Sequence, residues 1–173
     1  MNWAHVHLIL NHFPVVGLAF GLVLLAVSVV RKSTPLARVS LGILVAIAVI
    51  AIPVYLTGEP AEEVIEHLPG ISESYIEEHE ESALLTLIVI ELLGIVAAVG
   101  LRRFRQIDEL PRWFLTTTLF LSLVAGGFVG WTANLGGQIR HPEIRTGFQT
   151  PGQEREGLPA ESDDEREERE DAH

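Results

Sequence analysis

Four long apolar runs constrain this chain more than any other feature of its sequence. They lie between charged blocks, at about residues 4–30, 39–56, 83–101 and 113–135. About twenty apolar residues are needed for a helix to cross a hydrocarbon core of roughly 30 Å. A soluble bundle would carry polar residues at helical spacing on each outer face, and these runs do not. The sequence therefore predicts an all-α integral membrane protein whose four helices form an up-down bundle.

The segments outside these runs predict one further helix and a tail. Residues 60–68 have an amphipathic pattern with a proline in the first turn, which is typical of a short helix resting on the outer end of a bundle. From Thr150 onward the chain is rich in acidic residues, Pro and Gly and has almost no apolar side chains, as disordered segments do. We therefore expect a transmembrane domain over residues 1–149 and an acidic disordered tail over 150–173.

Charge indicates which way the bundle is oriented. The two links that join span one to span two and span three to span four hold seven basic and two acidic residues, whereas residues 57–82 hold nine glutamates and no Lys or Arg. Short loops rich in Lys and Arg stay in the cytoplasm. We expect a multi-pass protein of the bacterial inner membrane with both termini in the periplasm.

Composition also excludes several kinds of site and partner. The net charge of −11 argues against nucleic acid as a partner. The chain has no cysteine, which excludes disulfides, thiolate metal sites and covalent attachment of a c-type haem.

Seven histidines are present, and none lies on the basic side. His12 immediately precedes the continuous apolar run of span one and His79 lies four residues before that of span three, so both should lie near the outer membrane surface. His7 precedes His12 on the same segment, and His141 follows span four at the same end. Imidazoles on facing helices suit a b-type haem, and imidazole with a carboxylate such as Glu80 suits a mononuclear metal ion. We predict His12 and His79 as central ligands, with His7 and His141 as further ligands; the alternative is that all are ordinary interfacial side chains.

Glu91 is the one ionisable residue within a predicted span. Burying a charge there costs several kcal/mol, so such residues usually have a function. One hypothesis is a proton relay or a polar lock between helices. The other is a protonated carboxyl that is hydrogen-bonded to Thr116, Thr117 or Ser122 of a neighbouring helix.

Two spans carry glycines at spacings that permit close helix contact. We expect both faces to pack against neighbouring helices, within this bundle or within a larger assembly. The residues are Gly17 and Gly21 in span one, and Gly126, Gly127 and Gly130 in span four.

Residues 7–14 carry a family resemblance, and their sequence is HLILNHFP. This stretch resembles the His-x4-His-Phe-Pro opening of a bacterial four-span membrane family, a domain of unknown function. The family commonly has a proline after the first histidine, where this chain has Leu8. It also tends to have a histidine at the start of its third span and a Gly-Gly after its fourth, which His79 and Gly136-Gly137 match. Some relatives are joined to cytochrome c-type domains, so the resemblance implies an electron-transfer setting.

Together these features predict a small membrane protein that transfers electrons near the periplasmic face. The cofactor would be a b-type haem or a mononuclear metal ion, and no bond would be made or broken on a substrate. Its partners would be membrane lipid and a periplasmic redox protein. The rival prediction is a non-catalytic accessory or scaffold subunit of a larger respiratory or photosynthetic membrane complex.

Overall fold

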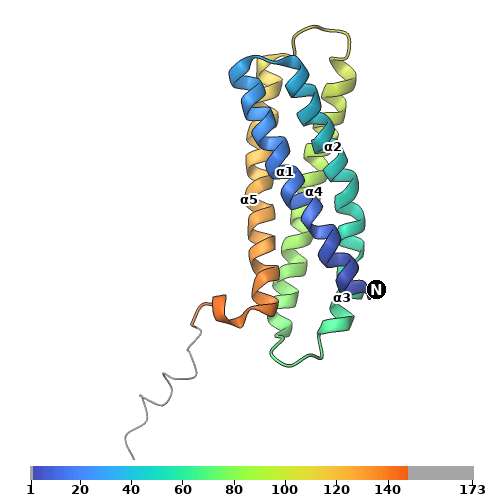
Figure 1. Cartoon of the computed structure of the whole chain (residues 1–173), viewed down its shortest axis with the longest axis vertical. Helices are drawn as coiled ribbons and strands as arrows, with labels where there is room; N and C mark the ends of the chain where they lie inside the picture. Colours follow the sequence, from blue (N-terminus) through green and yellow to red (C-terminus); the bar gives the residue numbers. More distant parts are fainter. Residues whose placement is uncertain (1, 148–173) are drawn as a thin grey trace, which may run out of the picture. The chain divides into compact units, whose positions relative to one another are not determined.

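The computed structural model of the protein describes residues 2–147, and its regular secondary structure there is entirely helical. The predicted all-α fold is therefore confirmed. The helices are α1 (Trp3–Arg31), α2 (Thr34–Leu56), α3 (Gly58–Ile65), α4 (Glu73–Arg103), α5 (Arg112–Arg140) and the 3₁₀ helix η1 (Pro142–Ile144) (Figure 1).

The chain up to Arg140 forms one compact unit that contains the four long helices. α1 packs against α2 and α5, and α4 packs against the same two helices, so α1 and α4 occupy diagonal corners of the bundle. The α1–α2 and α4–α5 links lie at one end, which we name the link end, and α3 lies at the other, the α3 end (Figure 1). The helices therefore alternate in direction, as the up-down topology requires.

A second compact unit begins at His141, and its described part contains η1. The predicted boundary at residue 149 and the predicted acidic tail lie outside the described residues.

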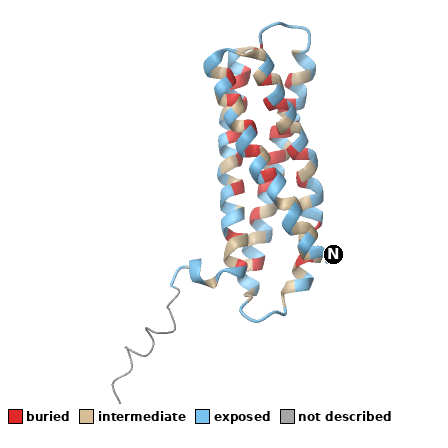
Figure 2. Cartoon of the chain, viewed as in Figure 1, coloured by how far each residue is buried: buried red, intermediate tan, exposed pale blue. Residues whose placement is uncertain are grey.

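The four long helices are long and apolar enough to cross a membrane. The second candidate span continues into α3, but α3 has three carboxylates in eight residues, so the membrane-spanning part of this segment is α2. Figure 2 shows buried and exposed residues alternating along each long helix. Large apolar side chains are exposed on the outside of the bundle, where Phe20 is 59% and Phe120 is 64% exposed. Such a surface is stable only when lipid covers it.

Several small hydroxyl side chains are buried among the apolar residues of the bundle interior. Most of them donate to a backbone carbonyl, and Thr86 is hydrogen-bonded to the hydroxyl of Thr132 at 2.7 Å, so their polar groups are satisfied as a membrane interior requires. Ser28 donates to Leu25 O at 2.7 Å, and Ser40 of α2 donates to Gly21 O of α1 at 2.8 Å. Hydroxyls and glycines at helix contacts are typical of membrane bundles, because small side chains let backbones approach closely.

The two sets of glycines have different environments. A Cβ at Gly17 would meet Ile47 of α2, and one at Gly21 would lie 3.2 Å from Leu44 of the same helix. A Cβ at Gly126, Gly127 or Gly130 of α5 would meet nothing within 4 Å. The expected packing within the bundle is therefore confirmed for α1 and is not found for α5.

The predicted amphipathic helix over residues 60–68 is present as α3, which begins two residues earlier and ends three residues earlier than expected. Thr57 joins it to α2 without a loop, because its N–H bonds to Pro53 O at 3.1 Å while its carbonyl accepts from Ala61 N at 3.2 Å. α4 runs without a break from Glu73 to Arg103, so this helix begins ten residues before the predicted third span at 83–101.

Candidate functional site

His7 lies on α1 at the α3 end, and its half-buried ring is fixed by the end of α2. Its Nδ1 lies 3.1 Å from Val54 O and 3.1 Å from Thr57 Oγ1. A carbonyl can only accept, so Nδ1 carries the hydrogen. Thr57 donates its own hydrogen to Val54 O at 2.8 Å, which leaves its oxygen able to accept from His7. The neutral ring therefore has its lone pair on Nε2.

His79 lies on α4 and is held in the same way by α5. Its Nδ1 donates to Thr132 O at 3.0 Å, so its lone pair is also on Nε2. The ring packs against Gly136, where a Cβ would lie 3.0 Å from its Cε1 atom and 3.3 Å from its Nδ1 atom. The Gly-Gly that follows the fourth apolar run thus provides space for this imidazole.

The two rings belong to the diagonal helices α1 and α4, and they are close enough to interact electrostatically. Neither Nε2 makes a hydrogen bond within residues 2–147. Histidines that bind metals usually donate the other ring N–H to a carbonyl or carboxylate, which fixes the ring and increases the basicity of the ligating nitrogen. This arrangement therefore offers two oriented, neutral imidazole nitrogens at one end of the bundle.

The sequence also indicates that His7 faces the bundle interior, through the spacing of the residues along α1. The buried positions Pro14, Leu18, Gly21 and Leu25 form one stripe along α1. His7 lies seven residues before Pro14, on the same face of the helix. Extending the stripe toward the N-terminus would have placed His7, rather than His12, inside the bundle.

His12 lies on the exposed face of α1, and its Nδ1 donates to Leu8 O of its own helix at 2.6 Å. Glu80 is exposed beside His79.

His141 belongs to the second unit, where its Nδ1 donates to Glu143 Oε1 at 2.8 Å. The N–H of Glu143 itself and this bond from His141 lower the pKa of the Glu143 carboxyl. Residues 2–147 contain no group of three or more His, Asp or Glu side chains that could hold a metal ion.

Glu91 has one carboxyl oxygen, Oε1, that is covered and has no hydrogen-bond partner within the described chain. Thr116 and Ser122 donate their hydroxyls to carbonyls of α5 instead, at 3.0 Å and 2.8 Å. The predicted hydrogen bond from a neighbouring helix is therefore not made to this oxygen.

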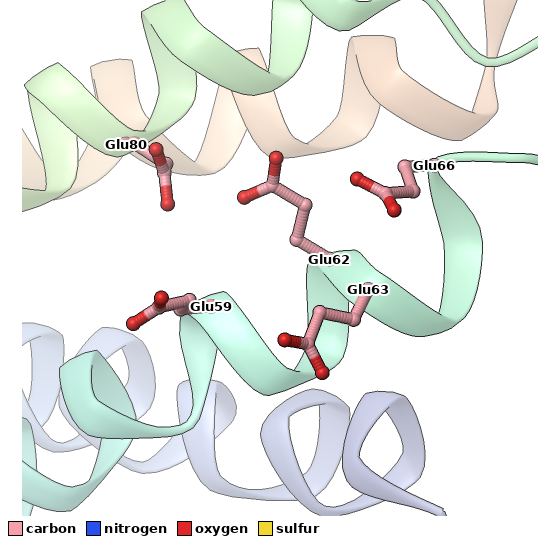
Figure 3. Close-up of a pocket in the computed structure, with 5 residues that line it drawn as sticks. All are labelled: Glu59, Glu62, Glu63, Glu66 and Glu80. Carbon is pink, nitrogen blue, oxygen red and sulfur yellow. The ribbon is translucent and has the colours of Figure 1, made fainter.

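A hollow of about 490 Å³ opens between α3 and α4, at the α3 end of the bundle where His7 and His79 also lie. Glutamates line it (Figure 3). Partial burial, a hydrogen bond with Glu80 and the nearby carboxylates together raise the pKa of Glu62 to about 7. This hollow makes the α3 end strongly negative. The lining residues are Glu59, Glu62, Glu63, Glu66 and Glu80.

Comparison with known proteins gives one finding about the whole bundle. A family model described as "Predicted membrane protein (DUF2231)" matches residues 4–142. The match covers all four long helices apart from Trp3, the first residue of α1. No curated protein and no solved structure matches the chain.

Proposed function

The chain belongs to the DUF2231 family of membrane proteins, and we propose that it binds a b-type haem through His7 and His79 and transfers electrons. The observation that carries the proposal is that the two rings share one hydrogen-bonding pattern and therefore one tautomer. Each donates its Nδ1 hydrogen to a backbone carbonyl of a neighbouring helix, at 3.1 Å from His7 and 3.0 Å from His79, and each keeps the lone pair of Nε2. Facing helices of bundles build cofactor sites from such side chains.

The number of donors favours haem over a single metal ion. A mononuclear zinc site takes three or four protein ligands, and no such group exists in residues 2–147. A haem needs only axial ligands from the protein because the porphyrin supplies the other four nitrogens. Two imidazoles are therefore a sufficient set for haem, and the absence of cysteine from the sequence leaves the non-covalent b type.

The chain's own residues would hold the two haem-binding imidazoles in position. The carbonyls of Val54 and Thr132 hold the two imidazoles in one tautomer and make Nε2 more basic. Gly136 leaves room for the His79 ring. Bound haem would supply a one-electron carrier, and the glutamate-lined hollow would favour a basic periplasmic redox partner.

The test is a spectrum of the full chain, purified in mild detergent from cells supplied with haem. We expect a Soret band and a reduced-minus-oxidised α band of b type, with about one haem per chain. A protein without a Soret band, even after incubation with added haem, would disprove the proposal. Elemental analysis of the same sample separates the cases, because a stoichiometric metal without a Soret band would indicate a mononuclear metal site.

A non-catalytic accessory subunit is the second candidate, and the outward glycines of α5 favour it. Their Cβ positions meet nothing within 4 Å, and glycines at such spacing permit close contact with a further transmembrane helix. This function predicts fixed membrane partners that co-purify in mild detergent, together with a colourless protein.

We also propose that the protein lies in a bacterial inner membrane with both termini in the periplasm. The links at one end of the bundle hold most of the basic residues of the spans and their flanks, which favours a cytoplasmic position for that end. Alkaline phosphatase fused after the chain should then be active, and a fluorescent protein fused there should be dark. The opposite result would reverse the orientation.

A further inference from the structure

Three arginines gather around a hollow at the link end of α4. Arg102, Arg103 and Arg105 line it together with Val99, and its volume is about 360 Å³. Val99 lies one helical turn back toward the middle of the span and is 58% exposed. The hollow is therefore apolar on its membrane side and cationic on the side of the link.

The charge of these arginines is not neutralised by the described part of the chain. All three are exposed, and no ion pair joins any of them to a carboxylate within residues 2–147. Asp108 and Glu109 of the same link are exposed and do not pair with them. The guanidinium of Arg103 lies over the Phe104 ring, 5.9 Å from its centre. The hollow can therefore accept an anion.

The backbone that carries these arginines is held in place by α2. Arg38 donates to Phe104 O at 3.3 Å, Arg105 O at 3.3 Å and Ile107 O at 2.8 Å. Trp113, in the first turn of α5 on the other side of the link, is 67% exposed. Exposed tryptophans at helix ends are typical of the headgroup level of a bilayer, so the arginines should lie at that level.

An exposed apolar line continues from the hollow along α4 toward the middle of the membrane. Leu92, Ile95 and Val99 follow one another at intervals of three and four residues and are 58%, 57% and 58% exposed. Arg102 and Arg103 continue this line by a further three and four residues. One face of α4 thus carries cations at the link end and exposed apolar side chains next to them, toward the middle of the span.

We propose that this face of α4 is a binding site for an anionic phospholipid. Guanidinium groups bind phosphate oxygens in a bidentate manner, and basic pockets at the ends of transmembrane helices bind anionic headgroups. The phosphate lies in the hollow among the three arginines, and an acyl chain lies along Val99 and Ile95. The inference is independent of the haem proposal, because no histidine takes part in it.

Native mass spectrometry of the full chain, released from mixed micelles, tests this site. The probes are phosphatidylglycerol and phosphatidylcholine with identical acyl chains, and inorganic phosphate serves as a soluble competitor. Each basic side chain near an anionic headgroup contributes a factor of roughly five in affinity. The triple variant Arg102→Gln/Arg103→Gln/Arg105→Gln should therefore bind phosphatidylglycerol roughly a hundredfold more weakly, whereas the matched variant Arg31→Gln/Lys32→Gln from the same end should bind as the native protein does.

Four results would overturn the proposal. The first three are equal binding of the two lipids by the native protein, unchanged binding by the triple variant, and an equal loss in the Arg31/Lys32 variant. Displacement of the lipid by millimolar inorganic phosphate would also overturn it, since the site would then recognise a free anion. If the triple variant does not fold, Arg103→Gln alone should still weaken phosphatidylglycerol binding roughly fivefold.

Discussion

Replacing His79 or His7 with alanine is expected to yield a protein that purifies without haem. Each substitution would remove one of the two nitrogens proposed to hold the haem, and it leaves the carbonyl that held the ring, Thr132 O or Val54 O, without that hydrogen bond. A b-type haem has no covalent bond to the protein, so loss of one of two ligands releases it during purification. The haem content, measured as the pyridine haemochrome per chain, should fall from about one to near zero in both variants.

His12→Ala is the matched control for this experiment. His12 lies on the same helix, five residues after His7, but its ring is exposed and bonded to its own helix through Leu8 O. We expect this variant to retain its full haem content and its elution volume in size-exclusion chromatography. If His12→Ala lost haem while His7→Ala kept it, the ligand pair would be His12 and His79. Full haem retention in all three variants would place the cofactor elsewhere.

The difference between His7 and His12 shows what the sequence of a membrane helix can and cannot specify. Hydropathy locates a residue along the membrane normal. It therefore predicted that the histidines of α1 and α4 lie at one end of the bundle, as they do. It does not specify rotation about the helix axis, because lipid-facing and buried faces of such a helix are equally apolar. Rotation is encoded in small and polar residues, such as Gly21 and Ser28 of α1, which are both buried.

The same ambiguity explains what could be predicted about the glycines. A glycine at a helix-packing spacing permits close approach, but the spacing does not say whether the partner belongs to the same chain. Gly17 and Gly21 meet α2, whereas Gly127 of α5 has open space around its Cβ position. The four spans followed from the lengths of the apolar runs, since the cost of exposing a backbone or a charge to lipid leaves few alternatives, and α3 followed from its amphipathic pattern.

Gly94→Ala is expected to destabilise the bundle, although alanine is the better helix former. A Cβ at Gly94 of α4 would collide with the Cβ of Ala48 of α2, and Leu44 O lies only 3.7 Å from its position. Ala48 is buried and its side chain has no rotamer that moves aside, so the two helices must separate. Forcing an extra carbon into a packed core costs about 1–3 kcal/mol. The midpoint of thermal unfolding in detergent should therefore fall by several degrees.

Two further variants identify the cause of that loss. Adding Ala48→Gly to Gly94→Ala removes the Cβ with which the new alanine collides, so it should reverse most of the fall in the unfolding midpoint. If Gly94→Ala acted by a general perturbation of α4, the second substitution would not restore stability. Gly127→Ala adds the same carbon to the open face of α5, where the higher helix propensity of alanine should leave stability equal or raise it by about 0.5–1 kcal/mol. A fall as large as that of Gly94→Ala would mean that another transmembrane helix covers this face. The accessory-subunit function would then gain support over a self-contained electron carrier.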